Sequence, residues 1–184
     1  MKNNILYIVV PCYNEEEVLT ETTKQLKAKL EDLIEKKVIA KESRVMYVND
    51  GSKDKTWQLI EKISKENELF TGISLSRNRG HQNALLAGLM TAKEYADIVI
   101  SMDADLQDDI NAIDDMLKKY YEGCDIVYGV RSSRKKDTWF KKTTAQAFYK
   151  FMKLMGVDIV YNHADYRLTS KKVLEHFADY KEVN

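Results

Sequence analysis

The chain has 184 residues, a length that suits a single domain with a sizeable core. Its hydrophobic fraction of 44% indicates a folded protein rather than a disordered one. The 29 basic and 29 acidic residues give a formal net charge of zero, which argues against a nucleic-acid-binding protein because such proteins usually carry a basic excess.

Short apolar runs predict the strands of the fold. The runs cover residues 5–10, 44–49, 71–75 and 98–102, and a further strand is expected over residues 125–129. Runs that are apolar throughout and rich in β-branched residues are typical of strands buried on both faces, as in a parallel sheet covered by helices.

Amphipathic patterns predict a helix after most of these strands. The helices are expected over residues 15–37, from about residue 56, and over residues 84–92, 110–121 and 170–177. The alternation of strand and helix predicts one α/β domain over residues 1–184, with a doubly wound, mostly parallel sheet and helices on both faces.

Cysteine usage and hydropathy indicate the compartment. Cys12 and Cys124 have no metal-ligand spacing, and two isolated thiols suit a reducing environment better than a disulfide scaffold. The first apolar run is too short for a signal peptide, and no segment reaches membrane-spanning length. The sequence therefore predicts a cytoplasmic location.

Polar clusters follow four of the predicted strands. They cover residues 11–15, 49–52, 76–80 and 103–107. Ligands of open α/β sheets bind outside the carboxyl ends of the strands, so these clusters are expected to form one site.

The acidic turn Asp103-Ala104-Asp105 is a candidate metal site. Two carboxylates separated by one residue at the end of a buried strand can both approach Mg²⁺ or Mn²⁺. Such a cation would neutralise the charge of a nucleotide diphosphate. The alternative is that the turn only caps the following helix.

The other loops offer groups for a nucleotide. Tyr13 offers a stacking face, and Glu15 and Asp50 offer hydrogen-bond acceptors for a base or ribose. The basic loop of residues 77–81 could face phosphate or sugar hydroxyls. For each loop the alternative is ordinary turn or helix-entry chemistry.

Several motifs of other enzyme classes are absent from the sequence. It contains no phosphate-binding Walker loop, no Gly-x-Gly-x-x-Gly fingerprint and no Gly-x-Ser-x-Gly elbow. These absences count against kinases, dehydrogenases and hydrolases.

Four motifs follow one another along the chain: VPCYNEE at residues 10–16, VNDGSKD at 48–54, SRN followed by GHQ at 76–82, and DADLQD at 103–108. Taken in this order, they resemble the family 2 glycosyltransferases. Within that family the sequence is most similar to the polyprenyl-phosphate sugar transferases, relatives of dolichyl-phosphate mannose synthase and bactoprenol glucosyltransferase. The motifs span most of the chain.

The resemblance implies a GT-A fold, a nucleotide-sugar donor (UDP-hexose or UDP-N-acetylhexosamine), Mg²⁺ or Mn²⁺, and inversion at the anomeric carbon. Asp105 would bind the metal directly, and Asp103 would lie near both the ribose and the metal. Gln107 would lie by the diphosphate or the sugar. The nucleoside would be held by Pro11, Tyr13, Glu15 and Asp50.

The resemblance also implies an acceptor side, with polyprenyl phosphate as the acceptor. Arg131 matches a family arginine that approaches phosphate, and Asp165 and Arg167 match the acceptor-side segment. A lipid phosphate is already ionised, whereas a saccharide hydroxyl needs a general base. For Asp165 a positioning or sugar-binding role is therefore preferred, with general base as the alternative.

The sequence departs from the family pattern in three places. Asn49 stands where many members have a second aspartate, and residues 109–111 replace prolines that often follow the acidic turn. Members of the lipid-phosphate branch usually continue into C-terminal transmembrane helices, which this chain lacks. We expect the chain to be the catalytic part of a longer protein that works at the inner face of the cell membrane.

The sequence is also compatible with two other functions. One is transfer to a soluble saccharide in cell-wall or capsule synthesis, and the other is nucleotide-sugar binding without catalysis. The basic, aromatic segment at residues 139–142 is predicted to lie near a membrane surface, with a core helix as the alternative. The sequence leaves open whether the chain forms a homo-oligomer.

Overall fold

Six strands and five helices make up the part of the chain that the computed structural model describes, residues 3–130 and 163–179. The strands are β1 (Leu6–Cys12), β2 (Arg44–Asn49), β3 (Phe70–Ser74), β4 (Ile98–Ser101), β5 (Ile126–Val130) and β6 (His163–Ser170). The helices are α1 (Leu19–Glu35), α2 (Thr56–Glu66), α3 (His81–Ala92), α4 (Ala112–Tyr121) and α6 (Lys171–Ala178).

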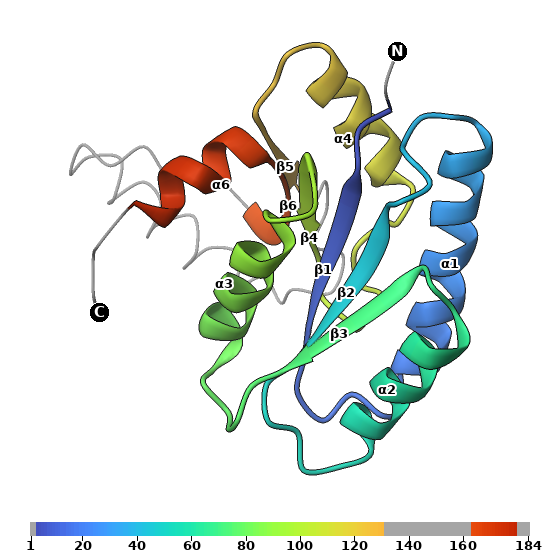
Figure 1. Cartoon of the computed structure of the whole chain (residues 1–184), viewed down its shortest axis with the longest axis vertical. Coiled ribbons are helices and arrows are strands. Elements are labelled where there is room, and N and C mark those ends of the chain that lie inside the picture. Colours follow the sequence, from blue (N-terminus) through green and yellow to red (C-terminus); the bar gives the residue numbers. More distant parts are fainter. Residues whose placement is uncertain (1–2, 131–162, 180–184) are drawn as a thin grey trace, which may run out of the picture.

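The strands form one sheet in the order β3-β2-β1-β4-β6-β5 (Figure 1). β1 pairs in parallel with β2 on one side and β4 on the other, and β2 pairs in parallel with β3. β6 is antiparallel to both β4 and β5, with Arg167 as the partner of Ser101 and of Tyr128. The predicted mostly parallel, doubly wound sheet is confirmed. The sequence did not predict β6, which brings the predicted acceptor-side segment next to β4.

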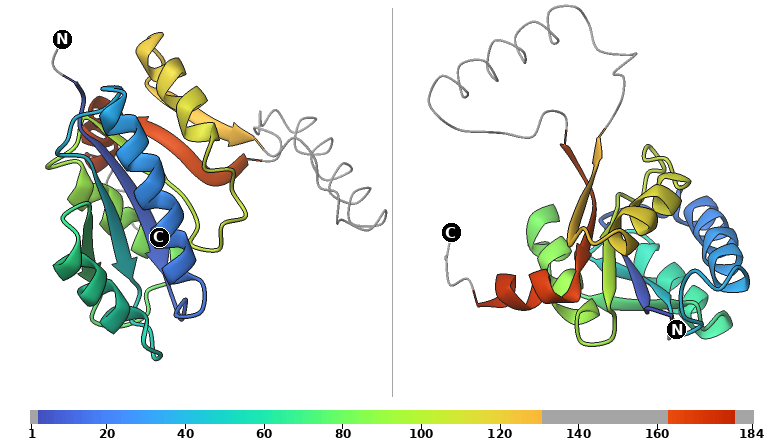
Figure 2. Two further views of the ribbon diagram at one scale, coloured as in Figure 1. Left: turned by 90° about the vertical axis from the view of Figure 1, so that its right-hand side faces the viewer. Right: turned by 90° about the horizontal axis from the view of Figure 1, so that it is seen from above.

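Helices cover both faces of the sheet, with α1, α2 and α4 on one face and α3 and α6 on the other (Figures 1 and 2). Strand alternation divides the side chains between two cores. In β1, Leu6, Ile8 and Val10 pack toward α1, whereas Val9 packs with α3. All four side chains are fully buried, so β1 is covered on both faces.

Two helices begin at residues other than those predicted. α1 begins at Leu19 rather than residue 15, because Asn14 has a left-handed φ of 56° and residues 15–18 form a turn. α3 begins earlier than residue 84, at His81. Residues 81–83 are exposed, so they lack the apolar periodicity that would have marked them as helical.

Three predictions on the acceptor side and the membrane surface concern Arg131, Asp165 and residues 139–142. Arg131 and the segment 139–142 lie outside the described residues, and Asp165 is placed in β6 by its backbone alone. Among the helices of the described residues, none combines the length and hydropathy needed to cross a membrane.

Candidate nucleotide and metal site

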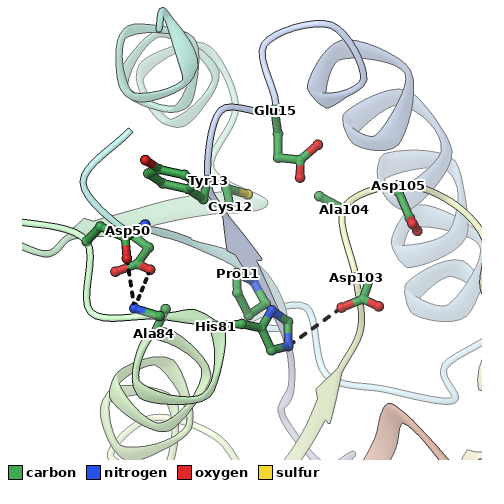
Figure 3. A pocket seen from close by; sticks show the side chains of 12 residues that line it. Pro11, Cys12, Tyr13, Glu15, Asp50, His81, Ala84, Asp103, Ala104 and Asp105 are labelled. Atoms are coloured by element: carbon green, nitrogen blue, oxygen red, sulfur yellow. Dashed lines mark hydrogen bonds and ion pairs between the residues drawn. The ribbon is translucent and has the colours of Figure 1, made fainter. Parts of the chain in front are cut away.

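A pocket of about 480 Å³ opens at the carboxyl ends of β1, β2 and β4 (Figure 3). Its walls combine residues from the predicted polar clusters with the first turn of α3. The lining residues are Pro11, Cys12, Tyr13, Glu15, Asp50, Asn78, Gly80, His81, Ala84, Asp103, Ala104 and Asp105. The structure therefore brings together every predicted donor-side residue except Gln107.

The loop after β1 is fastened to the loop after β2 by hydrogen bonds between backbone and side chains. The N–H of Asn14 donates to Oγ of Ser52 at 3.1 Å, and Oδ1 of Asn14 accepts from the N–H of Lys53 at 2.8 Å. The N–H of Glu15 donates to Oγ1 of Thr56 at 2.8 Å. Asparagine tolerates the left-handed conformation that this exchange requires.

This junction presents Tyr13 and Glu15 to the pocket. Tyr13 is 40% exposed, so part of its ring is free to stack on a planar ligand. Glu15 lies opposite the acidic turn, at the start of the segment that leads into α1 (Figure 3). The geometry is compatible with the nucleoside-binding role expected of both residues.

Asp50 forms the floor of the pocket between β2 and α3. Its side chain is almost completely buried, and its two carboxylate oxygens accept hydrogen bonds from the N–H groups of Arg79, at 2.6 Å, and Gly80, at 2.9 Å. Its own N–H donates to the carbonyl of Cys12. Asp50 therefore connects three segments of the pocket wall.

The acidic turn and the residues that follow it are anchored from the α1 and α4 face of the sheet. Oγ1 of Thr22 in α1 donates to the carbonyl of Ala104 at 2.7 Å, and the hydroxyl of Tyr166 in β6 donates to the carbonyl of Asp109 at 3.0 Å. Leu106 has a φ of 57°, and the N–H of the next residue donates to Oδ1 of Asp105. These contacts hold the turn so that its carboxylates border the pocket.

The carboxylates of the pocket influence one another. Burial raises the pKa of Glu15, and the nearby carboxylates of Asp105, Asp54 and Asp103 raise it further. Glu15, Asp103 and Asp105 all line the pocket, so negative charge is concentrated at this end of it. A divalent cation would relieve that repulsion, and carboxylate oxygens are the ligands that Mg²⁺ and Mn²⁺ prefer.

The donor set fits a cation that is shared with a ligand. No cluster of three or more histidine, cysteine, aspartate or glutamate side chains able to hold a metal occurs in residues 3–130 and 163–179. Asp103 and Asp105 alone match the mode in which one or two carboxylates bind Mg²⁺ and substrate phosphates complete its coordination.

The loop before α3 and the first turn of α3 contribute pocket residues to which the sequence assigned no individual role. Nε2 of His81 lies 3.8 Å from Oδ1 of Asp103, and the two side chains point toward each other (Figure 3). Asn78, Gly80 and Ala84 complete this wall. The sequence signal was the basic loop of residues 77–81, which was expected to face phosphate or sugar but carried no individual assignment.

Two predicted site residues lie away from this pocket. Gln107 is exposed and is not part of the lining. Arg167 instead lines a second, smaller pocket of about 150 Å³, together with Tyr128 of β5 and Phe177 of α6. This second pocket lies on the α3 and α6 face of the sheet.

The sequence was compared with protein families and with known proteins. The family model of glycosyl transferase family 2 matches residues 7–177. The uncharacterized glycosyltransferase YkoT of Bacillus subtilis (strain 168) is 57% identical over 180 residues, which cover 98% of this chain and 53% of that protein. A prophage bactoprenol glucosyl transferase homolog of Escherichia coli (strain K12) is 36% identical, with 96% of this chain and 56% of that protein covered. The chain thus spans about half the length of these curated relatives.

A solved structure shares the fold. Glucosyl-3-phosphoglycerate synthase from Mycobacterium tuberculosis, in complex with Mn²⁺, uridine diphosphate and phosphoglyceric acid, aligns with a TM-score of 0.61 at 15% identity. The alignment covers 92% of this chain and 57% of that one. The likeness confirms the predicted GT-A architecture.

Proposed function

The chain belongs to glycosyl transferase family 2, and we propose on this basis that it transfers a sugar from a nucleotide-sugar to polyprenyl phosphate, with inversion at the anomeric carbon. The observation that carries the donor half is the pocket that gathers Tyr13, Glu15, Asp103 and Asp105 from separate loops. The acceptor half is supported by the bactoprenol glucosyl transferase homolog among the relatives.

The donor is a UDP-hexose or a UDP-N-acetylhexosamine. Its base stacks on Tyr13, beside Pro11, and Glu15 accepts a hydrogen bond from the nucleoside. Asp103 would lie near the ribose and the metal. Gln107, which is exposed beyond the acidic turn, would lie by the diphosphate or the sugar.

Asp105, with Asp103, would hold Mg²⁺ or Mn²⁺, which when bound offsets the negative charge of the departing nucleoside diphosphate. The chain's own contribution is to fix these two carboxylates through the anchored turn. A preorganised carboxylate pair needs no rearrangement when the donor enters, and this lowers the cost of reaching the transition state.

The acceptor phosphate oxygen attacks the anomeric carbon on the side opposite to the leaving diphosphate. Because a phosphate is ionised at neutral pH, it needs charge compensation and orientation rather than a general base. Arg131 and Arg167 would supply the positive charge, with Arg167 reaching the acceptor from the second pocket rather than from the donor pocket, and Asp165 would orient the sugar or Arg167. The pairing of Arg167 with Ser101, two residues before Asp103, supports this placement because it sets β6 beside the metal turn.

Product analysis tests the proposal. The full-length protein is incubated with a panel of UDP-sugars and Mn²⁺, and with either undecaprenyl phosphate or soluble glycans. We expect labelled sugar in the lipid extract only with the polyprenyl phosphate. Label in the glycan instead would establish saccharide transfer, and saturable donor binding without any product would establish a nucleotide-sugar-binding protein that does not catalyse transfer.

The protein is expected to work at the cytoplasmic face of the cell membrane, where a polyprenyl phosphate headgroup is accessible to a cytoplasmic donor. Fractionation of cells that express the full-length protein tests this location. Recovery of all the protein in the supernatant after ultracentrifugation would contradict it.

A further inference from the structure

The second pocket, on the α3 and α6 face of the sheet, is a groove with a largely apolar lining. Five apolar side chains border it: Leu89 of α3, Ile126 of β5, and Val173, Leu174 and Phe177 of α6. Ile126 is 40% exposed, Phe177 is 50% exposed, and Tyr128 beside them is 41% exposed. A single exposed apolar side chain is ordinary, whereas several around one groove are typical of a site that binds an apolar partner.

Within the described residues that line this groove, Arg167 alone is charged. Among residues 3–130 and 163–179, no carboxylate forms an ion pair with its guanidinium. A guanidinium presents a planar fork of N–H donors that matches the oxygens of a phosphate. The groove therefore fits a ligand that combines an apolar chain with one anionic group.

The strand register gives the groove a direction. Arg167 pairs with Ser101, the last residue of β4, and β4 leads into the acidic turn. Thr169 lies two residues nearer to the start of β4 and pairs with Ile126 of β5. Two residues of a strand span about 7 Å. The cationic end of the groove is thus the end nearer to the acidic turn, and the apolar end with Ile126 lies farther from it.

The groove and the approach to the acidic turn lie on the same face of the sheet. Side chains alternate along β6, so Tyr166 and Leu168 pack on the α1 and α4 face, whereas Arg167 lines the groove on the other face. α3 lies on that other face too, and its His81 side chain points toward Asp103 (Figure 3). A ligand in the groove can therefore extend its charged end toward the acidic turn without crossing the sheet.

We propose that this groove binds the first isoprene units of the acceptor, with the phosphate at Arg167 and the chain between β5 and α6. The inference rests on the proposed function and deepens it, because it assigns the part of the site that recognises the lipid chain. A volume of about 150 Å³ is below that of a pocket for a drug-sized molecule. The groove therefore holds only the portion of the chain next to the phosphate.

Binding of short isoprenyl phosphates to the full-length protein, without Mn²⁺ or nucleotide, tests the inference. Ligand-observed NMR gives dissociation constants for dimethylallyl, geranyl and farnesyl phosphate, and for inorganic phosphate as the group without a chain. Each apolar carbon that leaves water adds to the affinity, so geranyl phosphate should bind at least about tenfold more tightly than inorganic phosphate. The further gain from geranyl to farnesyl phosphate should be smaller, because the groove is short.

Variants of the lining separate its apolar part from its charged part. Phe177→Ala removes an exposed ring and should weaken the binding of geranyl phosphate about fivefold, while the binding of inorganic phosphate stays unchanged. Arg167→Gln should weaken the binding of geranyl phosphate about tenfold, and Arg167→Lys, which keeps the charge, should recover part of that loss. In transfer assays, Phe177→Ala should raise the KM for undecaprenyl phosphate and leave the KM for the nucleotide-sugar unchanged.

Two matched controls lie on the helices that border the groove. Leu86→Ala removes an exposed leucine of α3 that lines neither pocket. Lys171→Gln removes a cation of α6 that does not line the groove. Neither change should alter the affinity for geranyl phosphate.

Four outcomes would overturn the inference. The first two are an affinity for isoprenyl phosphates that does not depend on chain length, and one that is equal in Phe177→Ala and the wild type. A wild-type dimer that Phe177→Ala dissociates would assign the groove to a second copy of the chain. A photo-crosslinking amino acid in place of Phe177 that reacts with another segment of the same chain would assign the groove to that segment.

The inference and the proposed function can fail separately. Transfer of sugar to undecaprenyl phosphate with a KM that the groove variants leave unchanged would contradict the inference alone. Binding of isoprenyl phosphates in the groove, with no transfer from any nucleotide-sugar, would support the groove as a lipid-phosphate site and contradict the proposed function.

Discussion

The N–H of Glu15 donates a 2.8 Å hydrogen bond to Oγ1 of Thr56, the first residue of α2. Thr56 is completely buried and takes no part in the pocket lining, yet it fixes a residue that does. The wall formed by the β1 loop therefore depends on the helix that follows β2, and residues outside the pocket control the position of residues inside it.

Thr56→Val should weaken both folding and nucleoside binding. Valine has the shape of threonine but no hydroxyl, so the N–H of Glu15 would lose its acceptor, at a cost of about 1–3 kcal/mol in the free energy of unfolding. Urea denaturation measures this loss, and uridine affinity should fall with it. Thr56→Ser retains the acceptor and should preserve uridine affinity. Equal uridine affinity in the valine and serine variants would show that the bond does not position the loop.

Asp105→Asn should remove most metal-dependent activity. An amide is a weaker ligand than a carboxylate for a hard cation, and charge stabilisation by a metal is worth several kcal/mol in the transition state, so we expect kcat to fall about 100-fold or more. Transfer assays over a range of Mn²⁺ concentrations measure the effect. Asp115→Asn, at an exposed carboxylate of α4, is the matched control. A kcat for Asp105→Asn that matches the control would exclude Asp105 as a metal ligand.

Tyr13→Ala should reduce the affinity for uridine, because stacking of a base on an aromatic ring contributes about 1–3 kcal/mol. Tyr13→Phe keeps the ring and should bind uridine as the wild type does. Tyr95→Ala removes an exposed tyrosine that stacks on Tyr7 and lies outside the pocket lining, so it should leave uridine binding unchanged. If the alanine and phenylalanine variants bind equally, the ring of Tyr13 does not contact the base.

Glu15→Gln should stabilise the protein at neutral pH while impairing its function. The pKa of Glu15 is raised in the folded protein by burial and by nearby carboxylates, so ionisation of this side chain opposes folding above that pKa. The penalty is relieved as the pH falls through the folded pKa toward the ordinary value of about 4.3. The Tm of Glu15→Gln should therefore exceed that of the wild type at neutral pH, and the difference should shrink as the buffer becomes more acidic. A difference that stays constant with pH would contradict this origin.

The sequence alone predicted the strands that are buried on both faces. β1, β2 and β4 could be recognised because each is an apolar run that ends at a polar loop. β6 was missed because its period-two pattern is short. Tyr166 and Leu168 pack against the α4 face, while Arg167 between them is polar and faces the other side. Only the pairing with β4 and β5 shows that this segment is a strand.

For the site, the sequence predicted which loops meet but not how each side chain is used. The position of Asp50 at the end of β2 places it at the pocket, whereas the direction of its carboxylate depends on the backbone of residues 79 and 80. No individual role was predicted for His81, because its proximity to Asp103 depends on the tertiary structure. The roles assigned to Asp165 and Arg131 stay predictions.

The grouping of Glu15, Asp103 and Asp105 at one end of the pocket also bears on competition among cellular anions. Free phosphate or an uncomplexed nucleotide carries negative charge and is repelled by these carboxylates. A nucleotide that arrives with its cation presents a smaller net charge and meets less repulsion. We therefore expect the carboxylates to favour a nucleotide that is already bound to its cation over free phosphate.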